Sequence, residues 1–208
     1  MAMMSRLIQI RHLSMEFPFV YSQTYAGSIS IQKLLDESEN ARRIEIFHAV
    51  EPSLLLLMRD KYGSRVIERC VECMIEVVNA RVAEVMIPHT AELSAHEHGC
   101  HVVQKVIEVG EYDFKRAIVD NLGEGDVEAL LGNPRGCHLL QKVIQYVHEG
   151  DVGVVVHVCN TQASQFVMHP HGCHVLKKIM NKTTNGEDVS GIIRAAINAS
   201  TSLAASKN

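Results

Sequence analysis

The sequence predicts an all-α fold, an α-solenoid in which helical repeats stack into a curved superhelix. A seven-residue phrase recurs five times. It consists of glycine, a small residue, a larger side chain, two aliphatic residues or near equivalents, and two polar residues. Its copies read GSISIQK (27–33), GSRVIER (63–69), GCHVVQK (99–105), GCHLLQK (136–142) and GCHVLKK (172–178). The glycines are 36, 36, 37 and 36 residues apart. Units this short cannot bury a core alone, so they must stack on one another.

Within each unit the apolar residues follow helical spacing. In the third unit, a buried stripe at the i, i+3 and i+4 positions is formed by Val102, Val103, Val106 and Ile107. A second helix is predicted from about residue 112 to 122, with its inner face formed by Phe114, Ile118, Val119 and Leu122. Turn residues separate the two, and the same division fits residues 60–90 and 134–160. Each unit is therefore expected to hold two helices after a short lead-in.

The domain organisation that follows is one solenoid with two ends of different character. Residues 25–198 are predicted to form five repeats. Residues 1–24 are an N-terminal segment or cap, with a period-two apolar pattern over 13–19 that Pro18 interrupts. Residues 199–208 are small and polar, and we expect a frayed tail.

Composition indicates a cytoplasmic protein. The chain of 208 residues is 47% hydrophobic, but it has no apolar run long enough for a membrane helix and no secretory signal pattern. A transit peptide, suggested faintly by Arg6 and Arg11, is the less favoured alternative. The six cysteines fall mostly at repeat positions, which argues for packing in a reducing compartment rather than for disulfides. The net charge of −4 counts against nonspecific binding to phosphate.

The recurring phrase resembles the RNA-reading helix of Pumilio-type (PUF) repeats. The resemblance rests on the period and on phrases such as DKYGSRVIE (60–68) and HGCHVVQK (98–105), and it covers about residues 24–198. It implies sequence-specific binding of single-stranded RNA, expected in messenger 3′ untranslated regions, and lower translation or messenger stability through recruited protein partners. No enzymatic activity, cofactor, metal, DNA or membrane partner is expected.

The resemblance also implies a role for three positions in each repeat. Base edges would be contacted by Ser28 and Gln32, Ser64 and Glu68, Cys100 and Gln104, Cys137 and Gln141, and Cys173 and Lys177. The residues that would stack between bases are Ile29, Arg65, His101, His138 and His174. Because a carboxylate only accepts hydrogen bonds, Glu68 suits guanine, whereas the glutamine pairs imply adenine. Since family members run antiparallel to RNA, the implied core is 5′ NAAGA 3′, with N unassigned because Lys177 departs from the usual pairs.

Several features allow a plainer interpretation. The repeated cysteines could be small core residues, and Cys70 and Cys73 form a lone CxxC that fits a packed helix face. His98 with His101, or His171 with His174, has a spacing that could hold a metal, although repetition explains it better. A basic residue follows each edge position, either near phosphate or on a solvated face, at Lys33, Arg69, Lys105, Lys142 and Lys178.

The alternative function is an α-solenoid scaffold for proteins with weak or lost RNA affinity. Such a scaffold has no reason to retain base-matching pairs, but Ile29 and Lys177 depart from the family pattern near the two ends. No catalytic motif is present: Gly123-Glu124-Gly125 lacks the third glycine of a dinucleotide loop, and HExxH and GxSxG do not occur.

Overall fold

The structure is a computed structural model that describes residues 17–73, 75–182 and 189–205, and every regular element in these ranges is a helix. The α-helices are α2 (Phe17–Ser22), α3 (Tyr25–Glu37), α4 (Asn40–Val50), α5 (Leu54–Arg59), α6 (Gly63–Glu72), α7 (Glu76–Met86), α8 (Thr90–Ala95), α9 (Gly99–Val109), α10 (Tyr112–Asp120), α11 (Glu124–Gly132), α12 (Pro134–Tyr146), α13 (Gly153–Thr161), α14 (Ala163–Phe166), α15 (Gly172–Lys182) and α16 (Ser190–Ala205). Three 3-10 turns, η1 (Glu51–Ser53), η2 (Ile87–His89) and η3 (Glu149–Asp151), join some of them.

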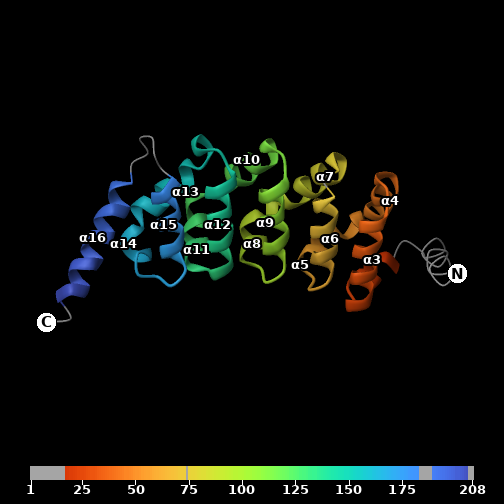
Figure 1. Ribbon diagram of the computed structural model, residues 1–208, viewed down its shortest axis with the longest axis horizontal. Coiled ribbons are helices and arrows are strands. Elements are labelled where there is room, and N and C mark those ends of the chain that lie inside the picture. Colours follow the sequence, from red (N-terminus) through yellow and green to blue (C-terminus); the bar gives the residue numbers. More distant parts are fainter. Residues whose placement is uncertain (1–16, 74, 183–188, 206–208) are drawn as a thin grey trace.

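The helices form five units of three that follow one another along an elongated molecule (Figure 1). Each unit has a short helix, a helix that carries the recurring phrase, and a third helix. We call the second kind the long helices: α3, α6, α9, α12 and α15. Each long helix packs against the long helix of the next unit, and the helices α3 and α16 lie towards opposite ends of the row. The predicted all-α solenoid is confirmed.

The predicted lead-in is itself a short helix in each unit, namely α2, α5, α8, α11 and α14. These helices have four to nine residues, as α14 and α11 illustrate. The four that have six residues or fewer show too few turns for a helical period to be recognised in sequence. The two other helices agree with the prediction, and Val102, Val103, Val106 and Ile107 are all buried.

Each long helix lies very close to the short helix before it, at the recurring glycine. A Cβ atom added to Gly136 would lie 2.6 Å from the carbonyl oxygen of Leu130 and 2.7 Å from its Cα. The residue six positions before each glycine lies equally close, with a backbone atom nearest in Tyr21–Gly27 and Leu130–Gly136. A side-chain atom is nearest in Leu57–Gly63, Leu93–Gly99 and Phe166–Gly172. The contact is tighter than a real Cβ tolerates, so only glycine fits without movement. This contact holds the first turn of every long helix at the same position relative to the short helix before it.

A hydrogen bond from the backbone N–H of the recurring glycine also holds the first turn of each long helix in place. The residue three positions before each glycine accepts a hydrogen bond from the glycine N–H, over 2.7 Å in the case of Asp60 Oδ1. The acceptors are Thr24 Oγ1, Asp60 Oδ1, His96 Nδ1, Asn133 Oδ1 and His169 Nδ1. Each bond satisfies a backbone donor that a helix start would otherwise leave open. Different side chains thus perform one capping role.

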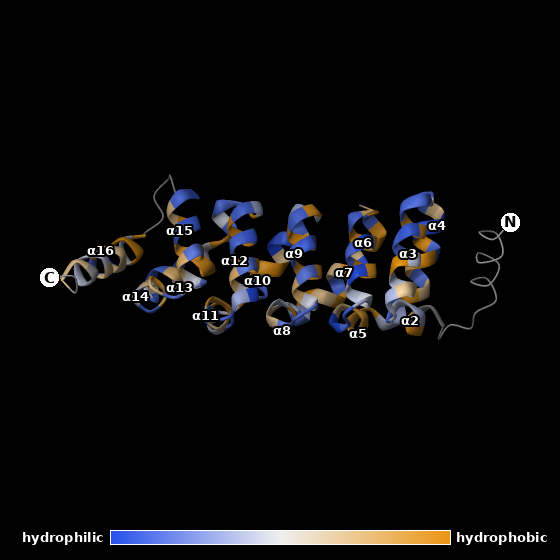
Figure 2. Cartoon of the chain, turned by 60° about the horizontal axis from the view of Figure 1, so that its bottom comes forward, coloured by the Kyte–Doolittle hydropathy of each residue, from blue (hydrophilic) through white to orange (hydrophobic). Residues whose placement is uncertain are grey.

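The core is continuous along the array. Neighbouring long helices bury aliphatic residues between them and against the short and third helices, and the largest of these are fully buried, such as Ile67 and Ile107. Figure 2 shows hydrophobic and hydrophilic sides on the same long helices. Because every unit shares its core with its neighbours, the units cannot be separated without exposing apolar surface.

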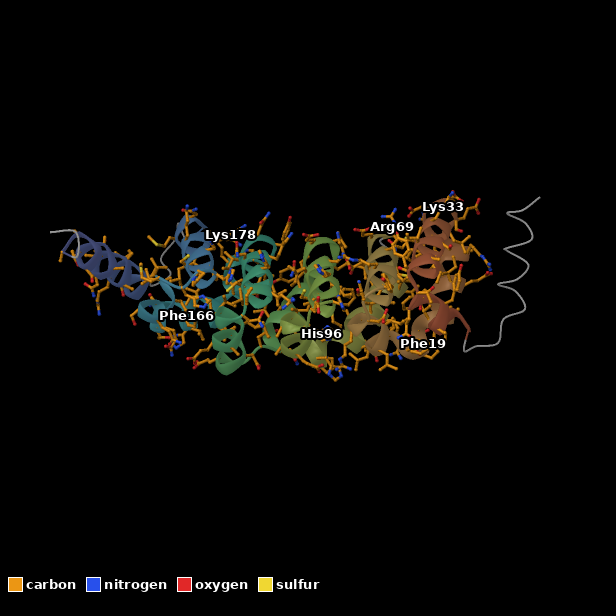
Figure 3. The ribbon with its side chains drawn as sticks, turned by 90° about the horizontal axis from the view of Figure 1, so that it is seen from below. Phe19, Lys33, Arg69, His96, Phe166 and Lys178 are labelled. Carbon is orange, nitrogen blue, oxygen red and sulfur yellow. The ribbon has the colours of Figure 1, made fainter. Side chains whose placement is uncertain are left out.

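A line of alternating charges, which we call the charge ladder, links the long helices across units. Arg69 bonds Asp36 of the preceding unit and, over 2.7 Å, Glu72 of its own helix. Lys105 bonds Glu72 over 2.7 Å and Glu108 over 3.3 Å. The line continues from Glu108 to Lys142, and Lys178 donates to Gln145 over 2.6 Å in the last unit. Figure 3 shows Lys33, Arg69 and Lys178 along one edge of the row.

The ladder decides between the two interpretations of the recurring basic residues. Lys33 pairs with Glu37 of its own helix, and the other four bond side chains of the neighbouring unit. Four of the five cations are therefore paired with carboxylates of the protein, whereas Lys178 bonds only the neutral amide of Gln145. A stripe of free cations for phosphate is not present at the four paired positions.

The ends differ from the expected boundaries. Helix α2 lies within the segment predicted as a cap, and it contacts α3, α4 and α6 in the manner of the other short helices. At the other end, α16 continues to Ala205, so residues 199–205 are helical rather than frayed. Ser200 Oγ donates to the carbonyl oxygen of Ala196, and the abundant alanine favours helix. Residues 1–16 and 206–208 lie outside the described part. None of the described helices is long and apolar enough to cross a membrane.

The glycine contact predicts a position-specific cost. Replacing Gly136 by alanine should lower the free energy of unfolding by about 1–3 kcal/mol, because the added methyl group meets the backbone of Leu130. Replacing Gly132 by alanine is the matched control, since a Cβ there meets nothing within 4 Å. It should be neutral or slightly stabilising. Urea unfolding followed by circular dichroism measures both, and equal effects of the two changes would refute the contact.

The charge ladder predicts a salt-dependent contribution to stability. Lys105→Gln should lower the free energy of unfolding by about 0.5–1 kcal/mol at low salt and by less at high salt. Lys33→Gln, which removes a pair within one helix, should cost about 0.5 kcal/mol or less. The hydrogen bond from Lys105 is the largest cause that lowers the pKa of Glu72. The difference between the two variants should therefore be present above the ordinary glutamate pKa and disappear as the pH falls through the lowered one.

Candidate nucleic-acid interface

The residues predicted to contact bases lie at matching places on the five long helices. They lie one, two and five positions after the recurring glycine, in the first two turns that follow the glycine contact and the cap. We call the surface formed by the stacking and second edge positions the motif face; it comprises Ile29, Gln32, Arg65, Glu68, His101, Gln104, His138, Gln141, His174 and Lys177. Four of the five stacking positions are exposed, and His101 is half-buried. Flat or branched side chains are thus presented at intervals of one repeat.

The small residue after each glycine is much less accessible. Ser28, Ser64, Cys100 and Cys137 are each 3% exposed or less, while Cys173 is half-buried. Ser28 Oγ donates to the carbonyl oxygen of Tyr62 over 2.8 Å, and Cys137 Sγ donates to that of Leu131 over 3.1 Å. Burial raises the pKa of Cys137 to about 11, so it is a neutral thiol at pH 7. These residues line the floor of the motif face, and the packing role considered for the cysteines agrees with their burial.

The second edge position keeps hydrogen-bonding capacity for a ligand. Gln32 Nε2 donates to Ser28 Oγ over 2.9 Å, and Gln141 Nε2 donates to the carbonyl oxygen of Cys137 over 3.2 Å. In both cases the amide oxygen remains able to accept. In the described part of the chain no protein group bonds the Gln104 side chain, which has both functions available. Lys177 is exposed and can only donate.

Glu68 and Arg65 form a pair within the motif face. One guanidinium nitrogen of Arg65 lies 3.2 Å from each carboxylate oxygen of Glu68. Burial nevertheless raises the pKa of Glu68 above its ordinary value, against the opposing effects of Arg65 and Lys105. The carboxylate is therefore costly to keep charged and unsatisfied, and donors from a ligand would stabilise it.

Histidine at the third unit stays uncharged near neutral pH. Burial lowers the pKa of His101, and the nearby charges of Arg65, His98 and Arg135 lower it further. A neutral imidazole presents a flat surface that stacks on a base without the cost of stripping water from a charge. The three neighbours come from the second, third and fourth units, so several units meet at this point.

A cavity of about 540 Å³ joins the units along this surface. It contains the predicted residues Ser28, Ile29, Gln32, Arg65 and His101. Sequence reasoning assigned no base contact to its other lining residues, which are Tyr25, Lys61, Tyr62, Glu97, His98 and Arg135. All six stand one or two positions before a recurring glycine, so the repeat register was the signal that could have found them. The rings of Tyr25 and Tyr62 lie edge to face, with centroids 6.0 Å apart.

The metal interpretation of the histidine pairs gains no support. Within the described residues no group of three or more histidine, cysteine or acidic side chains is arranged to hold an ion. His96 and His169 instead use Nδ1 to cap the long helices, over 3.2 and 3.0 Å. All six cysteines are free, and Cys70 of the CxxC lies in the core.

Comparison with known proteins identifies the repeat. The profile of the Pumilio-family RNA binding repeat matches residues 26–50, 53–82, 89–122, 129–157 and 162–195. Meiotic PUF family protein 1 of Schizosaccharomyces pombe is 27% identical over 105 residues, which are 50% of this chain and 18% of that protein. Putative pumilio homolog 8, chloroplastic, of Arabidopsis thaliana is 32% identical over 82 residues, or 39% of this chain and 16% of that protein. The chain covers less than a fifth of either relative.

Solved structures share the fold at low identity. The Puf3 RNA binding domain bound to Cox17 RNA 3′ UTR recognition sequence site A superposes with a TM-score of 0.79 at 21% identity, over 91% of this chain and 57% of that one. The RNA-binding domain of yeast Puf5p bound to SMX2 RNA gives a TM-score of 0.80 at 19% identity, over 91% and 55%. The five profile matches take up more than half of the chain and fall on its five stacked helical units. The chain therefore belongs to the Pumilio family of RNA-binding repeat proteins.

Proposed function

We propose that the protein binds single-stranded RNA on the motif face and selects its sequence there. The observation that carries the proposal is the motif face, on which stacking side chains alternate with half-buried amide and carboxylate groups, together with the adjoining cavity that Ile29, Gln32, Arg65 and His101 help to line. Each base that stacks on such a side chain gains about 1–3 kcal/mol. A base edge can then bond the group at the second edge position, so the arrangement supplies both affinity and selection.

The bases follow from the chemistry of each unit. Guanine offers two donors on its Watson–Crick edge, which suit the carboxylate of Glu68. The amides of Gln32, Gln104 and Gln141 can donate to and accept from adenine. With the RNA antiparallel to the chain, the proposed core is 5′ NAAGA 3′, and Lys177 faces the unassigned first base.

The biological role that we propose is regulation of messenger RNA in the cytoplasm. Several related solved domains are described as bound to 3′ UTR recognition sequences. We infer that this chain likewise binds messenger 3′ untranslated regions and lowers translation or stability by recruiting proteins. The net charge of −4 and the neutralised charge ladder support dependence on base contacts rather than on general attraction to phosphate.

The test is fluorescence anisotropy with two ten-nucleotide RNAs, one containing 5′ UAAGA 3′ and one containing 5′ UAAUA 3′, at fixed salt. The protein should prefer the first by roughly 5- to 150-fold, the equivalent of about 1–3 kcal/mol. Glu68→Gln should abolish or reverse the preference. Glu128→Gln, which removes the same charge from an exposed position on α11, should leave it unchanged.

Two outcomes would contradict the proposal. Equal affinity of the normal protein for both RNAs would remove sequence selection by Glu68. Binding to neither RNA, by a protein with an intact helical spectrum, would favour the protein-interaction scaffold.

The raised pKa of Glu68 predicts a pH dependence of base selection. Guanine donors stabilise the carboxylate, so the pKa of Glu68 should be lower in the complex than in the free protein. The preference for UAAGA should therefore fall as the pH drops through the raised pKa of free Glu68, at a higher pH than an ordinary glutamate would show. Glu68→Gln should have no such dependence. A preference in the normal protein that stays constant down to pH 4.5 would contradict the assignment.

A further inference from the structure

Some lysine and arginine side chains of the described residues bond a protein acceptor, and others do not. Most lysines and arginines bond a protein acceptor, as Arg59 does with Glu92 and Arg81 with Glu51. Among the described residues, the cationic side chains without an ion pair or hydrogen bond to a protein acceptor are Lys61, Arg135, Lys177 and Arg194. A cation that the fold leaves unpaired keeps its full capacity for an external anion.

Three of these four cations gather on one surface. Lys61 and Arg135 line the cavity, and Lys177 belongs to the motif face. Arg194 alone lies elsewhere, exposed on α16. Lys177 already has a proposed role toward a base, whereas Lys61 and Arg135 stand outside the three base-contacting positions.

Arg135 stands where two units meet. It lies exposed in the first turn of α12, directly before Gly136. It nevertheless lines a cavity whose other walls come from the first three units, and its charge acts on His101 of the third unit. The acids of this region are Glu68, which pairs with Arg65, and Glu97, and neither bonds Arg135.

Lys61 occupies the corresponding junction between the first and second units. Its Nζ lies 5.3 Å from the centroid of the Tyr62 ring, beside Tyr25 of the preceding unit. A cation held over an aromatic ring keeps its outward side open for a second, anionic partner. Both residues thus place an available charge between consecutive stacking positions, where the backbone of a bound strand must pass.

We propose that Arg135 and Lys61 bind phosphate groups of RNA lying on the motif face, each at a junction between units, in addition to the residues that contact bases. The inference rests on the proposed function. A guanidinium can hold two phosphate oxygens at once, and an ammonium acts as a point charge. Phosphates are the same in every sequence, so these two residues set the affinity and the register of the strand without choosing bases.

Salt dependence distinguishes this role from base contact. We would measure dissociation constants for the UAAGA and UAAUA RNAs between 50 and 300 mM KCl. The proteins compared are Arg135→Gln, Lys61→Gln and the normal protein. Each change should weaken binding to both RNAs by the same factor. Each should also reduce the slope of log K against log salt by about 0.7, the value for one phosphate of a single strand. Arg194→Gln, which removes an equally unpaired cation from α16, should match the normal protein.

Two results would overturn the inference. An unchanged salt slope in Arg135→Gln would show that Arg135 contacts no phosphate. A change in the ratio of the two affinities, with an unchanged slope, would show that it contacts a base. If the normal protein binds neither RNA, the proposed function itself fails, and this inference fails with it.

A measurement without RNA checks the position of Arg135. Because its charge helps to lower the pKa of His101, Arg135→Gln should raise that pKa in an NMR titration of the free protein. Arg194→Gln should leave it unchanged. An unchanged pKa in Arg135→Gln would contradict the placement of the Arg135 charge beside His101.

Discussion

The close contact between each recurring glycine and the short helix before it is the constraint on which the other features depend. In all five units the glycine meets the residue six positions earlier, and a capping side chain three positions earlier accepts its N–H. Both interactions act on the first turn of the long helix. That turn carries the small residue and the stacking residue, and the second edge residue follows in the next turn. Equivalent side chains are thereby held at the same position on each long helix. This alignment is what makes the motif face continuous from unit to unit.

Charge is distributed along the long helices so that binding capacity is concentrated on that surface. The ladder from Asp36 to Lys142 uses cations to hold neighbouring units together, and these cations are no longer available to a ligand. Lys61 and Arg135, by contrast, remain unpaired in the cavity. A protein with a net charge of −4 can in this way present local positive charge to a polyanion.

The sequence predicts the parts of the structure that repeat, because periodicity survives differences between units. The long helices, their buried stripes and the stacking of units follow from the 36- or 37-residue spacing. The short helices were expected only as lead-ins, since the four to six residues of α2, α5, α8 and α14 display too little period. Contacts between units could not be predicted from the sequence. The ionic partners of Lys105 and the burial of Cys137, for example, depend on residues that are distant in sequence. A role for Arg135 was not predicted because the residue before the recurring glycine differs from unit to unit. The other four units have Ala26, Tyr62, His98 and His171 there.

The central claim is that two successive turns of each long helix, positioned by its glycine, form the RNA-binding surface. An NMR titration of the isotope-labelled protein with the UAAGA RNA tests it most directly. The account predicts that the amide signals that shift belong to the first two turns after the glycine in α6, α9 and α12 and to the residues just before that glycine. Signals from α7, α10 and α13 should remain in place. Shifts concentrated in these third helices, or shifts spread evenly over the chain, would contradict the account.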